Sequence, residues 1–190
     1  MRYWNTHLRS IRPYIPGEQP LDRKFIKLNT NENPFPPSPK VRKAMKKAVN
    51  SNLRLYPDPT CRVLRETISK HFQLNPENVF IGNGSDEVLA FSFLCFFEPT
   101  EQILFPDITY SFYPVYAELY NLPYSSVPLN SSFEIIPEDY LLRNGGVVIP
   151  NPNAPTSIGL PSKEIEKIVL IDEAYFDFGG DSCVPLTDWR

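Results

Sequence analysis

The sequence contains few residues of the kinds that build metal centres and disulfide frameworks. Its three cysteines, Cys61, Cys95 and Cys183, lie far apart and form no CxxC pair, which argues against both a disulfide framework and a zinc site. With only His7 and His71, the chain also offers no convincing Ser/His/Asp set. We therefore expect no metal and no serine-hydrolase chemistry.

Long apolar runs and an excess of positive charge are also missing. The longest apolar stretch, residues 88–97, is too short to span a bilayer, and no apolar segment follows Met1 and Arg2. The 19 basic and 22 acidic residues are mixed along the chain, with a formal net charge of -3. This balance predicts no nucleic-acid surface and no membrane patch, so we expect a cytoplasmic protein with small-molecule partners.

What the chain does contain is a regular alternation of predicted strands and helices. Its 190 residues, 42% of them hydrophobic, suffice for a packed core. Helices are predicted at 38–50, 60–72, 85–97, 111–120 and 162–168, the first two with caps at Ser38 and Thr60. A short extended piece is expected at 53–58, and strands are expected at 78–81, 102–105, 124–128, 146–149 and 169–172. This order predicts an α/β fold with a mostly parallel sheet.

Segment 169–175, Val-Leu-Ile-Asp-Glu-Ala-Tyr, is a predicted strand that ends in an acid. Its apolar, largely β-branched residues suit a strand buried on both faces. Asp172 would then lie at the carboxyl edge of the sheet, where ligands collect, with Tyr175 within reach of the same crevice. The alternative is that Asp172 only caps the following turn.

Residues 82–87, Gly-Asn-Gly-Ser-Asp-Glu, stand at a predicted strand-to-helix junction. Free N–H groups at the start of a helix can hold a phosphate, and glycines let the backbone approach it. The alternative is that Asp86 and Glu87 only favour the helix N-terminus through its dipole. A phosphate is tolerable there if backbone groups and the Ser85 hydroxyl contact it while both carboxylates point elsewhere.

Two further loops add an aromatic ring and carboxamides. Tyr110 follows a predicted strand, where its ring could cover a planar cofactor, although tyrosines more often simply pack. The loop 151–153 offers asparagines to a ring hydroxyl, although Asn-Pro pairs also make ordinary turns. A phosphate-binding helix start, an aromatic ring, a carboxamide and an acid are together the groups needed to bind pyridoxal 5'-phosphate.

Six motifs in this chain resemble those of histidinol-phosphate aminotransferases, which are fold-type I pyridoxal-phosphate enzymes, and they occur in the family's order. They are Leu-Asn-Thr-Asn-Glu-Asn-Pro (28–34), Leu-Tyr-Pro-Asp-Pro (55–59), Gly-Asn-Gly-Ser-Asp-Glu (82–87), Phe-Pro-Asp-Ile-Thr-Tyr (105–110), Asn-Pro-Asn-Ala-Pro-Thr (151–156) and Ile-Asp-Glu-Ala-Tyr (171–175). Each is weak alone, but their order makes the match specific. The resemblance implies an N-terminal arm, residues 1–30, followed by a partial aminotransferase large domain, residues 31–190.

The resemblance also assigns roles around the cofactor. Ser85 and Asp86 are expected to hold its phosphate through backbone groups, and Tyr110 to stack on its ring. Asp172 is expected to pair with the pyridine nitrogen and Tyr175 with the ring 3-oxygen, which makes these two the catalytic residues of this chain.

Further roles implied by the resemblance concern the substrate and a second subunit. Tyr56 matches a tyrosine that reaches the phosphate across a homodimer interface, and the substrate side is formed by Tyr14, Asn31, Glu32 and Asn33. The implied reaction moves an amino group from glutamate, which becomes 2-oxoglutarate, to imidazole-acetol phosphate. Its product is L-histidinol phosphate, in histidine biosynthesis.

The sequence departs from the family pattern at several places. The family forms its Schiff base with a lysine in a Ser-x-Ser-Lys type segment after the Asp-Glu-Ala-Tyr strand, whereas Lys163 and Lys167 lie before that strand. Ala154 occupies the place of the asparagine that binds the ring 3-oxygen, so Asn153 or Asn151 would have to serve. The connection to residue 169 is also short for a parallel crossover.

We therefore expect a fragment that is catalytically inactive by itself and that, in isolation, aggregates or stays partly molten. Two other interpretations remain open at this point. One is an enzyme similar to threonine-phosphate decarboxylase, whose loops look alike. The other is a non-catalytic binding or scaffold protein made from half an aminotransferase domain.

Overall fold

The computed structural model describes residues 3, 5–20, 25–141, 143–164 and 170–187. The chain divides into two compact units. The first, called the sheet unit below, comprises residues 1–14 and 82–190, and the second, called the helical unit, comprises residues 15–81. The expected division into an arm of residues 1–30 and a domain of residues 31–190 stays a prediction.

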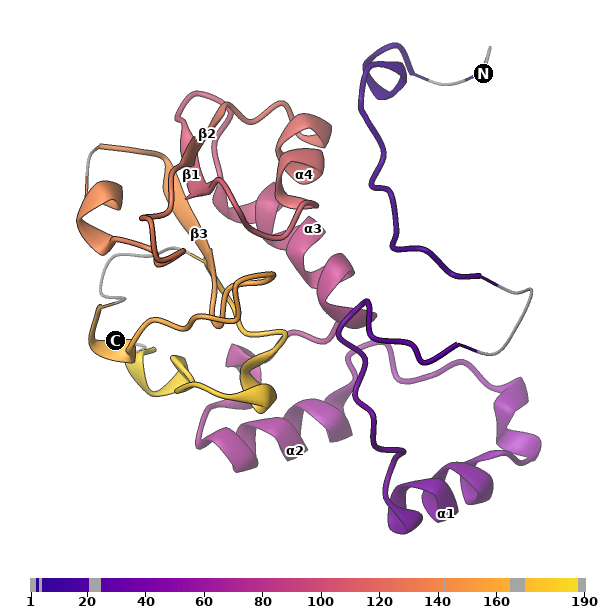
Figure 1. Ribbon diagram of the computed structural model, residues 1–190. Helices are drawn as coiled ribbons and strands as arrows, with labels where there is room; N and C mark the ends of the chain where they lie inside the picture. Colours follow the sequence, from indigo (N-terminus) through magenta and orange to yellow (C-terminus); the bar gives the residue numbers. More distant parts are fainter. Residues whose placement is uncertain (1–2, 4, 21–24, 142, 165–169, 188–190) are drawn as a thin grey trace. The chain divides into compact units, whose positions relative to one another are not determined.

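The sheet unit contains one four-stranded sheet in which all neighbouring strands are parallel (Figure 1). The strand order is β2-β1-β3-β4, so the chain crosses over between neighbours. The strands are β1 (Ile103–Pro106), β2 (Tyr124–Val127), β3 (Gly146–Pro150) and β4 (Leu170–Asp172). Parallel strands joined by crossover connections confirm the predicted α/β fold.

The two central strands are buried on both faces and the outer strands are not. Every residue of β1 and β3 is buried, whereas all three residues of β4 are half-buried. The prediction that the strand before Asp172 is buried on both faces is therefore wrong. Strand β4 pairs only with β3, so one of its sides has no strand beside it among the described residues. Val169, the first residue of the predicted strand, lies outside the described residues.

Side chains alternate between two cores on the faces of the sheet. Ile103 and Phe105 of β1 join the core that contains α3, whereas Leu104 joins the second core with Ile135 and Tyr140. This is the two-residue period of a strand. Full burial of one such side chain contributes about 1.5–3 kcal/mol.

Two α-helices cover the first core, and their bounds are α3 (Gly84–Phe96) and α4 (Tyr113–Leu119). Helix α3 matches its predicted range. Helix α4 is shorter than the predicted 111–120 because a turn occupies residues 111–112, and Pro114 stands in its first turn, where it fits best. The unit also has short 3-10 turns, at His7–Arg9, Pro137–Tyr140, Ser162–Glu164, Phe176–Phe178 and Val184–Leu186. The rest of the predicted helix 162–168 lies outside the described residues.

The helical unit contains α1 (Pro39–Ala48), α2 (Arg62–Phe72) and the 3-10 turns Ser51–Arg54 and Pro76–Asn78. The Ser38 hydroxyl accepts from the Val41 N–H, which confirms the predicted cap of α1. The prediction of an extended segment at 53–58 is wrong for Leu53 and Arg54, which belong to the 3-10 turn Ser51–Arg54.

Thr60 does not cap α2, contrary to the prediction. The Asp58 carboxylate does so instead, accepting from the Thr60 N–H at 2.9 Å and from the Arg62 N–H at 3.0 Å. The Thr60 hydroxyl donates to the same carboxylate at 2.8 Å. A charged acceptor at this helix end outcompetes a neutral hydroxyl.

The predicted strand 78–81 is also wrong. Residue 78 ends a 3-10 turn, and Val79 has extended backbone angles, but no paired strand is assigned to this segment among the described residues. A strand requires a neighbour that takes its hydrogen bonds, and extended propensity alone does not supply one.

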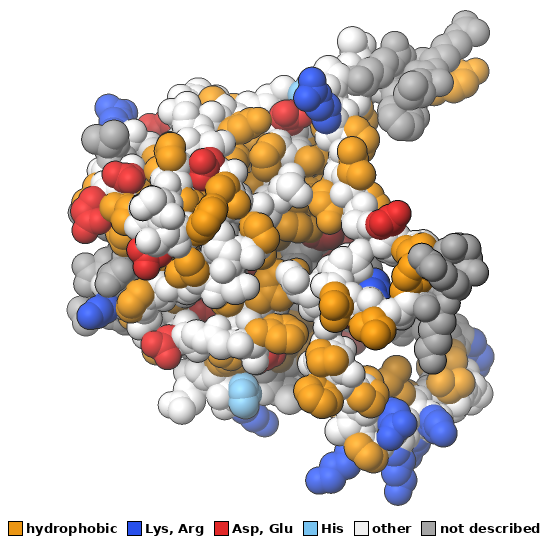
Figure 2. Space-filling model, in the orientation of Figure 1, with side chains coloured by type: hydrophobic (Ala, Val, Ile, Leu, Met, Phe, Trp, Pro, Cys, Tyr) orange, Lys and Arg blue, Asp and Glu red, His pale blue; other side chains and the backbone are white. Residues whose placement is uncertain are grey.

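Much of the apolar surface of the helical unit is exposed. Helix α1 has no buried residue, and Val41 and Met45 on it are 48% and 61% exposed. Figure 2 shows hydrophobic and basic side chains mixed in the region of α1. No helix in the described ranges has the length and hydropathy needed to cross a bilayer.

Candidate functional site

The carboxyl ends of β1, β3 and β4 lie at one edge of the sheet, because parallel strands point the same way. The last residues of these strands are Pro106, Pro150 and Asp172. Three of the loops predicted to bind the cofactor, at 107–110, 151–156 and 173–175, begin at these ends, whereas residues 82–87 follow no strand assigned among the described residues. The edge therefore gathers most of the predicted cofactor residues of this unit.

Asp172 has a partner on each carboxylate oxygen. Its Oδ1 accepts from the Ala174 N–H at 3.1 Å, so the turn-capping alternative holds for one oxygen. Its Oδ2 accepts from the Tyr113 hydroxyl at 2.8 Å. Each carboxylate oxygen has two acceptor sites, so the half-buried group keeps capacity for a further donor.

Sequence reasoning missed Tyr113. Its hydroxyl partner is 59 residues away along the chain, and no local pattern reports such a contact. The available signal was its position three residues after Tyr110, at the start of a helix whose apolar residues face the sheet. Its side chain is fully buried, with the ring centroid 6.1 Å from that of Phe93 and 5.9 Å from that of Phe105.

The phosphate site expected at the start of α3 depends on where the carboxylates of Asp86 and Glu87 point. Asp86 accepts through Oδ1 from the Tyr110 hydroxyl at 2.8 Å and from the Tyr116 hydroxyl at 3.3 Å. Glu87 accepts from the Asn83 N–H at 2.6 Å. Both carboxylates are thus engaged by groups of the chain itself. Gly84 has a φ of 81°, and a Cβ there would meet no atom within 4 Å, so the first turn is open.

Three tyrosines connect this helix end to the acid on β4. The Tyr110 ring lies edge-on to the Tyr113 ring, with centroids 5.6 Å apart. The centroid of the Tyr14 ring lies 6.4 Å from that of the Tyr110 ring. Burial, followed by hydrogen bonding to Asp86, raises the pKa of Tyr110 well above its usual range. The pKa of Tyr113 is also raised, first by burial and second by the negative charge of Asp172. Burial, followed by the negative charge of Asp86, likewise raises the pKa of Tyr116. All three hydroxyls are therefore protonated donors at neutral pH.

Asn151 and Asn153, the two candidates for binding the ring 3-oxygen, differ in whether their side-chain atoms already have partners. Both polar atoms of the Asn151 side chain bond to the backbone of Leu160, at 3.1 and 2.8 Å. Asn153 donates through Nδ2 to the Ile108 carbonyl at 2.9 Å, and its buried Oδ1 has no partner among the described residues. The buried Thr109 hydroxyl is likewise without a partner there. Of the two asparagines, Asn153 keeps an acceptor for a ligand.

Residues after Asp172 form a short structured loop. Tyr175 is half-buried, and its ring lies 6.3 Å from that of Phe178. Glu173 accepts from the Ser182 hydroxyl at 2.8 Å and from the Cys183 N–H. Burial, followed by the negative charge of Glu173, raises the pKa of Cys183 to about 11. This thiol is therefore protonated and unreactive at neutral pH.

The predicted residues of the helical unit are arranged by local contacts. Glu32 pairs with Lys27, Asn33 accepts from the Phe35 N–H at 2.9 Å, and Asn31 has a left-handed φ of 52°, which asparagine tolerates. Tyr56 is fully exposed. Their roles toward a substrate or a second subunit stay predictions.

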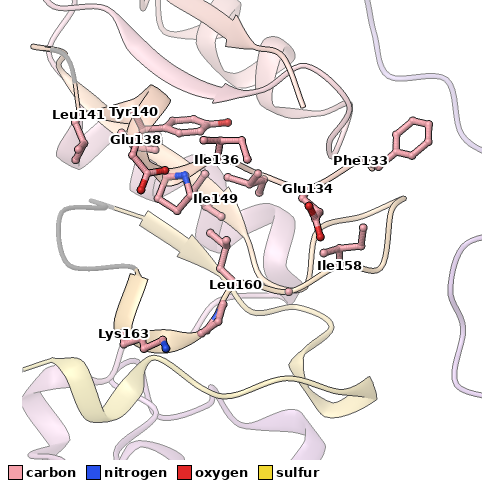
Figure 3. A pocket seen from close by; sticks show the side chains of 15 residues that line it. Phe133, Glu134, Ile136, Glu138, Tyr140, Leu141, Ile149, Ile158, Leu160 and Lys163 are labelled. Atoms are coloured by element: carbon pink, nitrogen blue, oxygen red, sulfur yellow. The ribbon is translucent and has the colours of Figure 1, made fainter. Parts of the chain in front are cut away.

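A cavity of about 680 Å³ is lined in part by Ile158 and Leu160, whose backbones bond to the asparagine loop 151–153 (Figure 3). Its walls belong to the second core and include Ile135, Tyr140, Val147 and Ile149. The Tyr140 hydroxyl is buried without a partner among the described residues. The walls of this cavity are mainly aliphatic. The edge with its hydrogen-bonded acids and tyrosines is the better candidate for chemistry.

Comparison with known proteins places the chain in a family. The sequence profile of aminotransferase class I and II matches residues 23–188. The histidinol-phosphate aminotransferase of Clostridium beijerinckii is 55% identical over 191 residues, covering 96% of this chain and 53% of that protein. The enzyme of the same name from Clostridium acetobutylicum is 52% identical, covering 96% and 54%. The chain thus spans about half the length of the curated relatives it matches.

Solved structures agree on the fold. A putative histidinol-phosphate aminotransferase from Erwinia carotovora atroseptica superposes with a TM-score of 0.73 at 24% identity, over 83% of this chain and 51% of that one. The histidinol-phosphate aminotransferase of Sinorhizobium meliloti, solved in complex with pyridoxal-5'-phosphate, gives 0.70 at 22% identity, over 80% and 44%. The expected fold-type I architecture is confirmed, and the chain belongs to the class I and II aminotransferases, a pyridoxal-phosphate-dependent family.

Proposed function

We propose that this chain forms the cofactor-binding part of a histidinol-phosphate aminotransferase, which uses glutamate to convert imidazole-acetol phosphate into L-histidinol phosphate. The observation that carries the proposal is the series of side chains from Asp86 through Tyr110 and Tyr113 to Asp172, at one edge of the sheet. The names of relatives at 52–55% identity favour this aminotransferase over a decarboxylase.

The residues present fit pyridoxal 5'-phosphate. The open first turn of α3 offers backbone N–H groups of Ser85 and Asp86 to a phosphate. The half-exposed Asp172 retains acceptor capacity for a protonated ring nitrogen. The buried Oδ1 of Asn153 lacks a donor, which a hydroxyl on a ring would supply.

When bound, the cofactor supplies an electron sink for the carbon that carries the amino group. Asp172 would keep a proton on the ring nitrogen, which makes that sink effective. Tyr110 would cover one face of the ring and exclude water from it. Tyr175 and Asn153 would bind the ring 3-oxygen, and the start of α3 would anchor the phosphate.

The remaining roles belong to a longer, homodimeric protein. The full exposure of Tyr56 suits a side chain that reaches the phosphate of a partner subunit. Tyr14, beside Tyr110, and the loop 31–33 would line the substrate side. No lysine follows Asp172 among the 190 residues. A polypeptide of these residues alone should therefore bind the cofactor without transaminase turnover.

Equilibrium binding of pyridoxamine 5'-phosphate tests the proposal. This ligand carries no aldehyde, so it cannot react with surface lysines. We expect saturable binding that Asp172→Ala weakens about tenfold or more, because the variant removes the charged partner of the ring nitrogen. Asp139→Ala, at an exposed acid on the 3-10 turn Pro137–Tyr140, is the matched control. No binding by the unaltered chain, or equal binding by the two variants, contradicts the proposal.

A further inference from the structure

The Tyr113 side chain, which bonds to Asp172, is held more firmly than Asp172 itself. The Tyr113 ring is fully buried between Phe93 and Phe105, so packing fixes where its hydroxyl lies. Asp172 is half-buried and ends β4, which pairs only with β3 among the described residues. The bond of 2.8 Å between the Tyr113 hydroxyl and Asp172 Oδ2 therefore connects a fixed donor to a less restrained acid.

This bond determines the orientation of the carboxylate. The Ala174 N–H alone, at 3.1 Å from Oδ1, leaves the group free to rotate about its side-chain torsions. A second donor on Oδ2 fixes the plane of the carboxylate and still leaves acceptor sites on both oxygens. An acid that must meet a planar ring in one direction gains from such preorganisation.

We propose that Tyr113 is a positioning residue that holds the Asp172 carboxylate in the orientation that receives the protonated ring nitrogen of pyridoxal phosphate. This inference rests on the proposed function and adds the group that supports its acid. Tyr113 acts through Asp172. Its ring also lies edge-on to Tyr110, with centroids 5.6 Å apart, so one buried side chain locates both the acid and the aromatic plate.

The donor role persists over the working pH range. Burial, and after it the charge of Asp172, raises the pKa of Tyr113 far above its ordinary value. The hydroxyl therefore stays protonated and donates throughout the neutral range.

The variant Tyr113→Phe tests the inference because it keeps the ring and its packing and removes only the hydroxyl. Pyridoxamine 5'-phosphate is titrated into each protein, and its absorbance is followed against pH to report protonation of the ring nitrogen. We expect Kd to rise about tenfold, and the pH midpoint of nitrogen deprotonation to fall by roughly half a unit or more. Tyr140→Phe is the matched control, since that buried hydroxyl has no partner among the described residues, and it should change neither value.

A double-variant cycle separates positioning from general stabilisation. In an Asp172→Ala background, Tyr113→Phe should change Kd less than about twofold, because the acid through which it acts is gone. An equal loss in both backgrounds would show a merely structural effect and overturn the inference. An unchanged Kd and pH midpoint in a folded Tyr113→Phe chain would overturn it too, while leaving the proposed function standing. Failure of the unaltered chain to bind would contradict the proposed function, and the inference with it.

Discussion

The sheet unit and the helical unit differ in how completely they bury their apolar residues. In the sheet unit, β1 and β3 are buried throughout, and an aromatic core that includes Phe93, Tyr113 and Tyr116 covers one face. In the helical unit, α1 buries no residue at all. The first unit is organised by its own contacts, whereas the second presents apolar surface without a cover in the described part of the chain.

This difference also appears in the polar and apolar groups that each unit leaves without a partner or a cover among the described residues. Polar groups in the sheet unit are mostly engaged with one another, and two of the buried atoms left without partners among the described residues, Asn153 Oδ1 and the Thr109 hydroxyl, follow the strands β3 and β1. In the helical unit, apolar side chains such as Met45 and Leu53 are exposed instead. The account predicts that substitutions will affect the two units very differently.

The largest effect is expected from Phe93→Ala in the first core. Phe93 is fully buried and contacts the rings of Phe97, Tyr113 and Tyr116. Removing the ring leaves a cavity and should lower the free energy of unfolding by about 3–5 kcal/mol. Urea denaturation followed by circular dichroism measures this loss. A loss below about 1 kcal/mol would mean that the core is not the organising element described.

A smaller effect is expected from Tyr116→Phe, which keeps the ring and removes a donor to Asp86. The Tyr116 hydroxyl donates to the Asp86 backbone carbonyl at 3.0 Å and to its Oδ1 at 3.3 Å. We expect a loss of about 1 kcal/mol in the free energy of unfolding. Tyr140→Phe, with no bond to lose, is the control and should leave stability unchanged or improved. A reversed order of the two variants would contradict the assigned network.

Asp58 gives the helical unit a pH dependence. Hydrogen bonds from the Thr60 N–H, the Thr60 hydroxyl and the Arg62 N–H lower the pKa of Asp58 below its usual 3.8. A carboxyl whose pKa is lower in the folded state stabilises it above the unfolded pKa and loses that contribution as pH falls through the folded pKa. Helical signal from residues 62–72, followed by NMR, should therefore decline in acid. Asp58→Ala should start with a weaker helix whose signal no longer depends on this step.

The smallest effect is expected from Met45→Lys on α1. Met45 is 61% exposed, and lysine has a helix propensity similar to that of methionine. The free energy of unfolding should change by less than about 0.5 kcal/mol. A loss above about 2 kcal/mol in the same urea experiment would show that Met45 is buried, and the contrast between the two units would fail.

The sheet was largely predictable because its signal is local. Buried strands of a parallel sheet are continuous apolar runs, and residues 103–106 and 146–150 show this pattern plainly. Segment 78–81 has the same character, but no strand is assigned to it among the described residues. Half-burial of β4 was not predictable either, because it depends on the position of the strand in the sheet and not on its own residues.

The site was predictable only in part, for a related reason. Asp172 and Asp86 stand at the ends of recognisable elements, so their positions follow from the pattern. Tyr113 looks like an ordinary core residue, and only the fold brings its hydroxyl to an acid 59 residues away. The choice of Asn153 over Asn151 likewise needed the hydrogen bonds that occupy Asn151.

The most direct test of the account is a map of where the cofactor binds. Pyridoxamine 5'-phosphate is titrated into the 15N-labelled chain, and amide shifts are followed by heteronuclear NMR. The account predicts saturable shifts at residues 84–86, 108–113 and 172–174, on one edge of the sheet. Shifts confined to residues lining the cavity of about 680 Å³, such as Ile135, Leu141 and Ile158, or no saturable shifts at all, would contradict it.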